Sequence, residues 1–491
     1  MTAVERSAGS GSGAPAYGQA ADRARRIPFP TVDEISRHCL QDDEPETVHI
    51  EVHLPGRPEP DRLRAAFREA LRRHPRILVR ETPGRWWRRR YEWEVTDGPD
   101  VEPVSFPPCA ADALTRARER ALAVCPPLTA SPPVRLEVVT EPDRTGCVLV
   151  LTVNHTALDG PSCLRVLATA ATLYGGGAAR ATPPTAPPPP AVAPAPPVAP
   201  APPVAPAPPV APAPPVAPAP PVAGAPPARG LARPVRIARD THTPRTGNAM
   251  LLSELPVPPR PPGAPGPAPR PTVNDQLLVA TCLMAARWNT LHGRSPDPVR
   301  ITMPVDDRPR GASEMAIGNG TRLVEVGFGP EERAESRLLT RETPDPAAVA
   351  RLLRRTAART RALKAAPGAQ LGVAGTLLTL PAVPVGLRAA VTRGLRRAAG
   401  PWTSTTLLSN IGRIPYALDF GEAGEATAVW FSAPARMPRG LTVTTASTGG
   451  RLHVTLRWSR ALLDDAAGAG LAGLFQRALA ATARAHAEGT A

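Results

Sequence analysis

The 491-residue sequence lacks the marks of several common classes of protein. Its six cysteines form no Cys-x-x-Cys pair and no His-x-x-x-His accompanies them, so we expect no metal site. A phosphate-binding loop and a Gly-x-Ser-x-Gly turn are both missing, which argues against P-loop nucleotide hydrolases and elbow-type serine hydrolases. No charged segment followed by an apolar run opens the chain, so we expect a cytoplasmic protein with reduced thiols.

Lysine is almost absent, since Lys364 is the single example, and the formal net charge of +15 comes from arginine. These arginines are spread along an Ala/Pro/Gly-rich chain and form no binding stripe, so we expect no nucleic-acid partner. The one dense patch spans residues 85–93. There Trp87, Tyr91 and Trp93 share one face at period two, which predicts a half-buried strand with a basic outer face.

Long hydrophobic runs are also scarce. Residues 365–387 are uncharged and long enough to span a bilayer, but Pro381 and Pro384 interrupt them. This pattern favours a buried or channel-lining segment. We therefore do not expect insertion into a membrane or contact with one, and contact with a lipid surface stays open as the alternative.

The most informative feature is a histidine and an aspartate, His155 and Asp159, that lie four residues apart directly after an apolar run. The run from Cys147 to Val153 is short and β-branched, which predicts a buried strand. Gly160 behind Asp159 is typical of a turn with positive φ. The imidazole can accept a proton near neutral pH, whereas the aspartate can hold the loop by an ion pair. On these residues alone, a capped strand end with a turn is the simpler interpretation.

This His-x-x-x-Asp-Gly pattern, followed by an apolar helix, resembles the active-site motif of the coenzyme-A-dependent acyltransferase superfamily. That superfamily includes nonribosomal peptide condensation domains, polyketide-associated acyltransferases, wax ester synthases, BAHD enzymes and chloramphenicol acetyltransferase. Further resemblances follow in the order that the superfamily shows: Arg73-His74-Pro75, Thr272-Val273-Asn274-Asp275, the segment 303–308, Gly318-Asn319 and the segment 409–413. Together they cover roughly residues 28–180 and 232–485.

The resemblance implies an α/β (α+β) fold of two chloramphenicol-acetyltransferase-like lobes, each a mixed sheet flanked by helices, with the active site in a tunnel between them. His155 would be the general base that deprotonates a hydroxyl or amine acceptor. The acceptor would then attack the thioester of an acyl-CoA or of an acyl or peptidyl carrier protein. We therefore expect an acyltransferase of secondary-metabolite or lipid biosynthesis, with a small-molecule acceptor, no bound cofactor and a monomeric state.

The same resemblance implies roles for further residues. Asp159 would hold the loop through a salt bridge to Arg308, and Gly160 would allow the backbone to approach the thioester. Ser409 and Asn410 would line the pocket or steady an oxyanion, although turn residues at a strand end are an equally good interpretation.

One position departs from the motif. Condensation domains and wax synthases usually carry two adjacent histidines, and here the first is Asn154. The BAHD branch does without that first histidine, so an active enzyme is still expected. A catalytically degenerate scaffold that binds a carrier protein or another partner is the alternative, and a basic interaction protein that shares only the fold is a third.

Composition divides the chain into four segments. Residues 1–26 are small and polar, which predicts a disordered tail. Residues 27–180 would form the N-terminal lobe, and residues 232–491 the C-terminal lobe. Between them, residues 181–231 repeat Pro-Ala-Pro-Pro-Val-Ala with valine every six residues from Val192 to Val222, which predicts a polyproline II spacer.

Overall fold

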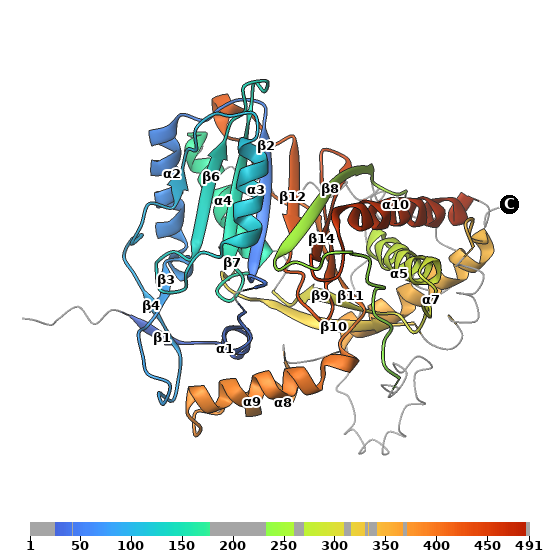
Figure 1. The fold of residues 1–491 in the computed structure, drawn as a ribbon. Helices are drawn as coiled ribbons and strands as arrows, with labels where there is room; N and C mark the ends of the chain where they lie inside the picture. Colours follow the sequence, from blue (N-terminus) through green and yellow to red (C-terminus); the bar gives the residue numbers. More distant parts are fainter. Residues whose placement is uncertain are drawn as a thin grey trace, which may run out of the picture.

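The computed structural model describes residues 25–41, 43–176, 232–259, 270–308, 316–328, 332, 341–366 and 371–487. The predicted spacer at 181–231 and nearly all of the predicted tail at 1–26 lie outside these residues. The described chain forms two mixed sheets with helices packed on them and a small antiparallel sheet of three strands (Figure 1). The predicted α/β architecture is therefore confirmed.

The first lobe is built on a five-stranded sheet in the order β12-β2-β7-β6-β5. Its strands are β2 (Thr47–Leu54), β5 (Val104–Ser105), β6 (Val134–Val139), β7 (Cys147–Asn154) and β12 (Ala428–Ser432). Helices α2 (Pro60–Arg73) and α4 (Gly160–Tyr174) pack against each other, while α3 (Ala113–Ala123) contacts β2, β6 and β7. All residues of β7 are buried because both faces of the sheet are covered.

The alternation of β7 side chains shows how these layers divide the core. Leu149, Leu151 and Val153 belong to the main core with α2 and α4, whereas Val148 and Val150 belong to a smaller cluster with α3. Successive side chains of a strand point to opposite faces, so one apolar run serves two cores. The motif histidine follows directly where this strand ends.

The second lobe is built on a six-stranded sheet in the order β10-β9-β11-β13-β14-β8. Its strands are β8 (Asn248–Pro256), β9 (Arg300–Asp306), β10 (Thr321–Gly327), β11 (Thr406–Arg413), β13 (Leu441–Thr448) and β14 (Arg451–Ser459). Helices α5 (Val273–Leu291), α7 (Pro346–Ala365) and α10 (Asp465–Ala487) cover one face (Figure 1). Gly449 and Gly450, both with positive φ, make the turn between β13 and β14 as their sequence predicts.

The opposite face of β14 is polar and meets the first lobe. Arg457 is fully buried there and donates to the carbonyl oxygen of Thr47 at 2.8 Å and to Asn248 Oδ1 at 2.7 Å. Beside it, β12 pairs antiparallel with β2, although β12 comes from the second half of the chain. The sheets therefore do not follow the sequence boundary near residue 232, because one strand crosses to the first lobe.

Two expectations about apolar residues are wrong. The predicted strand over residues 85–93 is confined to β4 (Glu92–Val95), which pairs with β1 (Arg26–Pro28) and β3 (Val79–Glu81). Tyr91 and Trp93 are buried, but Trp87 lies in a turn and is exposed. A local alternation cannot show where the neighbouring strands stop pairing.

The uncharged segment near residues 365–387 is not buried throughout. It contributes α8 (Gly372–Leu378) and the start of α9 (Val385–Ala398), which lie along α1 (Thr31–His38) at one edge of the molecule (Figure 1). Leu377 and Leu387 are exposed. Among the helices of the described chain, none combines the length and the apolar character that a membrane span needs.

Candidate active site

His155 lies at the end of β7 and lines a cavity of about 430 Å³ between the lobes. The first lobe contributes Glu46, Val48 and the motif residues Asp159 and Gly160 to the cavity wall. The second contributes Asp306 of β9 and Ser409 and Asn410 of β11, and Phe431 comes from β12, the strand that crosses to the first lobe. This volume lies in the range of small-molecule sites, ~300–1,000 Å³.

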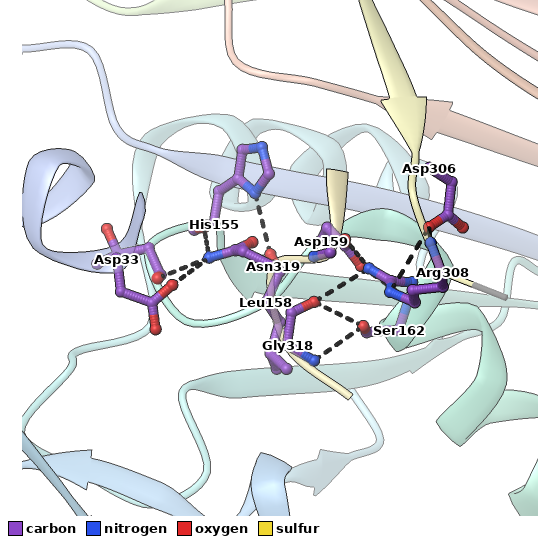
Figure 2. Close-up of polar contacts among 11 residues, drawn as sticks. Asp33, His155, Leu158, Asp159, Ser162, Asp306, Arg308, Gly318 and Asn319 are labelled. Atoms are coloured by element: carbon purple, nitrogen blue, oxygen red, sulfur yellow. Dashed lines mark hydrogen bonds and ion pairs between the residues drawn. The ribbon is translucent and has the colours of Figure 1, made fainter. Parts of the chain in front are cut away.

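The His155 ring is fixed by one hydrogen bond. Its Nδ1 lies 3.0 Å from the carbonyl oxygen of Leu158, and because a carbonyl can only accept, Nδ1 must donate (Figure 2). The neutral ring therefore keeps its lone pair on Nε2. Nε2 makes no hydrogen bond to any residue that the structure describes, so it is available to a ligand in the cavity.

Asp159 serves as the N-cap of α4 and as the partner of Arg308. Its Oδ1 accepts from the Ser162 amide at 3.0 Å, and its Oδ2 accepts from the Gly320 amide at 2.9 Å. The same Oδ2 forms the ion pair with Arg308 that the sequence suggested. Asp159 thus ties the histidine loop to the second lobe, and its carboxylate is fully engaged in this role.

A side chain would be too close to a neighbour at position 320, but at position 160 it would make only an ordinary contact. Gly160 begins α4 and is absent from the glycines with positive φ in the described chain, so the expected turn conformation is wrong. A Cβ at Gly160 would meet the Phe431 ring at 3.4 Å. A Cβ at Gly320 would lie 2.0 Å from Arg308 Nε. Because Gly320 has no side chain, Arg308 can lie against the backbone there and reach Asp159.

Asn319 connects the histidine loop to a buried carboxylate. Its Nδ2 donates to Asp33 Oδ1 at 2.8 Å and to the carbonyl oxygen of Thr156 at 2.9 Å, with the His155 carbonyl oxygen at 3.3 Å (Figure 2). Burial raises the pKa of Asp33, while Arg76, 3.0 Å away, opposes that shift. The role of Asp33 was missed in the sequence, because nothing near it in the chain marks it as part of the site.

Asn154 does not line the cavity. Its Nδ2 donates to the Pro126 carbonyl oxygen at 2.9 Å, and its Oδ1 accepts from the Thr156 amide at 3.1 Å. Both ends of the amide are therefore used to shape the loop. The residue therefore holds the end of β7.

Ser409 and Asn410 reach the cavity, as expected of pocket residues. Asn410 Oδ1 accepts from the Gly412 amide at 2.9 Å and from Thr445 Oγ1 at 3.1 Å, across a bulge in β11. Asn410 therefore stabilises the irregular strand, whereas the Ser409 hydroxyl makes no hydrogen bond to the residues that the structure describes.

Arginines give the cavity a basic wall that sequence reasoning missed. Arg439 donates to Ser404 Oγ at 3.0 Å and to Thr302 Oγ1 at 3.2 Å, and no carboxylate of the described residues forms an ion pair with it. Burial lowers the pKa of Arg439 to about 10. Arg436 and Arg396 also line the cavity, and Arg436 pairs with Glu46. Within the described ranges, no group of His, Cys, Asp or Glu side chains is arranged to hold a metal ion.

Comparison with known proteins finds two sequence relatives and several solved structures with a similar fold. No family model matches the sequence. Uncharacterized proteins from two Mycobacterium tuberculosis strains are 27% identical over 405 residues, covering 80% of this chain and 84% of theirs.

Among solved structures, the condensation domain of the Monacolin K polyketide synthase MokA has a TM-score of 0.55 at 12% identity, covering 94% of this chain and 98% of that chain. A mutant starter condensation domain of the rhizomide synthetase RzmA, in complex with C8-CoA, has a TM-score of 0.54 at 13% identity, with 94% and 95% covered. This chain therefore has the condensation-domain fold.

Proposed function

We propose that this protein transfers an acyl group from an acyl thioester to a hydroxyl or amine acceptor, with His155 as the general base. The observation that carries the proposal is the fixed ring of His155, which keeps Nδ1 on the Leu158 carbonyl and Nε2 free in the cavity. A base must present a lone pair within reach of the acceptor proton, and this tautomer does so. The donor would be an acyl-CoA or a phosphopantetheinyl carrier protein, as the C8-CoA in the RzmA structure suggests.

The chemistry assigned to these residues follows from their positions. Nε2 takes the proton of the acceptor O–H or N–H as the acceptor atom bonds to the thioester carbonyl carbon. The tetrahedral intermediate then expels the thiolate, which recovers the proton from His155 as the C–S bond breaks. An ester or amide and a free thiol result. Asp159, Arg308 and Asn319 position the loop, and proximity in the cavity supplies much of the rate.

Thiol release tests this function directly. Purified protein is incubated with an acyl-CoA and candidate acceptors, and free thiol is followed with a chromogenic disulfide. We expect release that depends on the acceptor, lowered by ~10²–10⁴-fold in His155→Ala as is typical when a general base is lost. His292→Ala is the matched control, because His292 pairs with Asp240 outside the cavity lining. Wild-type turnover in His155→Ala would exclude the mechanism.

A non-catalytic scaffold is the second candidate. It is favoured by Asn154, whose amide fills a structural role where relatives of this fold usually carry a histidine. The same assay decides between the two, because a scaffold would bind acyl thioesters or carrier proteins without acceptor-dependent release of thiol.

A further inference from the structure

An apolar ridge covers the outer side of the α8–α9 edge. We define the α8–α9 ridge by Leu377, Leu387, Val391 and Leu395, together with Trp86 and Trp87 of the adjoining turn. Leu377 is 62% exposed, Leu387 54% and Trp86 66%. Large exposed apolar patches mark interaction surfaces. We therefore expect the ridge to bind a partner.

Most of the ridge is the outer, apolar face of the amphipathic helix α9. Leu387, Val391 and Leu395 recur every four residues and form one stripe along α9. The opposite side is held against α1, where Arg388 pairs with Glu34 at 3.0 Å and Thr392 contacts His38. Because α1 already covers the inner side of α9, the outer leucines are not needed for the core of the protein.

The tryptophan turn continues the ridge. The Gly386 amide donates to the Trp86 carbonyl oxygen at 2.8 Å, which places the turn at the N-terminal end of α9. The Trp86 and Trp87 rings contact each other edge to face at 5.8 Å, and the Arg85 guanidinium lies 4.9 Å from the Trp87 ring. Exposed tryptophans beside arginines are typical of segments that sit at the boundary between lipid headgroups and acyl chains.

The two segments that form the ridge carry charge of one sign. The sequence has no aspartate or glutamate between Asp345 and Asp419, and none between Glu81 and Glu92. Arg393 and Arg397 flank the stripe, are exposed and form no ion pair with any residue that the structure describes. Arg85, Arg89 and Arg90 are exposed beside the tryptophans. Such a surface is complementary to anionic lipid headgroups.

We propose that the α8–α9 ridge docks the protein on the surface of a bilayer that contains anionic phospholipid. The apolar residues run along a helix and onto a turn, an elongated stripe that suits a planar interface. The ridge also adjoins the candidate site, because Arg396 of α9 lines the same cavity as His155. Docking would therefore bring the cavity beside the lipid phase. That the docked protein takes an amphiphilic substrate from the bilayer rests on the proposed function, whereas docking itself does not.

Vesicle flotation tests the proposal with the full chain and no substrate. We expect binding to phosphatidylglycerol/phosphatidylcholine vesicles that weakens with salt, and little binding to phosphatidylcholine alone. The variant Leu387→Gln/Val391→Gln/Leu395→Gln should lower the partition coefficient at least about tenfold, because three apolar side chains no longer enter the interface. Arg393→Gln/Arg397→Gln should lower it roughly thirtyfold and reduce its salt dependence.

The controls separate docking from solubility and from catalysis. Val124→Gln/Leu291→Gln changes two comparably exposed apolar residues outside the ridge and should bind like wild type. His155→Ala should also bind vesicles fully, so a protein that docks without acyl transfer would refute only the proposed function. Wild-type protein that stays unbound, or a triple variant that binds normally with an unchanged melting curve, would overturn the docking. So would a ridge-dependent complex with a holo acyl carrier protein in place of vesicle binding.

Discussion

Asp159 of the first lobe and Arg308 of the second form an ion pair whose side chains are only 3% and 8% exposed. The pair joins the two lobes four residues after His155 in the chain, and the carboxylate also caps α4. The histidine loop is therefore anchored by a contact that exists only when both lobes are assembled.

Asp159→Asn should destabilise the fold by ~3–5 kcal/mol, because Arg308 would keep a buried charge without its main partner. Arg308→Met added to Asp159→Asn should recover much of that loss, since the uncompensated charge is gone. Chemical denaturation of wild type, both single variants and the double variant measures the coupling. A charge swap is a weaker test, because arginine at position 159 cannot accept from the Ser162 and Gly320 amides. Additive single effects would contradict a direct pair.

Gly320→Ala should disrupt the same pair without touching a charge. The added methyl would lie 2.0 Å from Arg308 Nε, so the guanidinium must leave Asp159, at a cost of ~1–3 kcal/mol as for other overpacked sites. In an Arg308→Met background the same change should cost much less. Gly98→Ala is the matched control, because nothing lies within 4 Å of a Cβ there. Equal melting temperatures for Gly320→Ala and wild type would refute the close approach.

Asn319→Asp should be more damaging than Asn319→Ala. Alanine removes donors to Asp33 and to the loop carbonyls, at ~1–3 kcal/mol for each buried group left unpaired. Aspartate adds a second carboxylate against Asp33 as well. Turnover should fall in both variants while circular dichroism stays native, because the His155 loop loses its support. If Asn319→Asp had a higher melting temperature than Asn319→Ala, the hydrogen bond from Asn319 to Asp33 would not be the contact that stabilises the loop.

His38 should make stability depend on pH. Burial, reinforced by the charges of Arg388 and Arg393, lowers its pKa from 6.5 to about 4. Between those values the unfolded chain binds a proton that the folded protein does not, so the contribution of His38 is full above pH 6.5 and is lost as the pH drops toward 4, with a slope that approaches ~1.4 kcal/mol per pH unit. Burial raises the pKa of Glu34, 3.6 Å from His38, to about 7, so Glu34 contributes the opposite slope over nearly the same range. His38→Gln should therefore change the slope of the stability profile by up to the His38 term relative to wild type, and an unchanged slope would show that His38 does not titrate there.

Arg439→Met should stabilise the unliganded protein or leave it unchanged, and lower activity. The buried guanidinium has only hydroxyl partners at hydrogen-bond distance among the described residues, so an apolar side chain of similar length removes an unfavourable burial of charge. A cation kept in a cavity at such a cost is expected to serve binding. Thermal melts and the KM for anionic acyl thioesters measure the two effects. A large loss of stability would show that Arg439 is structural.

The sequence by itself determined the local elements and the order of the motifs. Apolar runs at period two or 3.6 predict β7, α2, α5 and α10 because burial on one or both faces imposes those periods. The His155 motif and the residues of the second lobe that contact it could be named because each belongs to a short, local sequence motif.

Only the tertiary structure decided which distant segments meet. The pairing of β12 with β2 and the bond from Asn319 to Asp33 join residues hundreds of positions apart, and no local pattern records such a pairing. The exposure of Leu387 also depends on what packs against α9, since the same apolar spacing serves a core or an outer face. Sequence periodicity reports that a face is apolar, whereas assembly of the two lobes decides whether anything covers it.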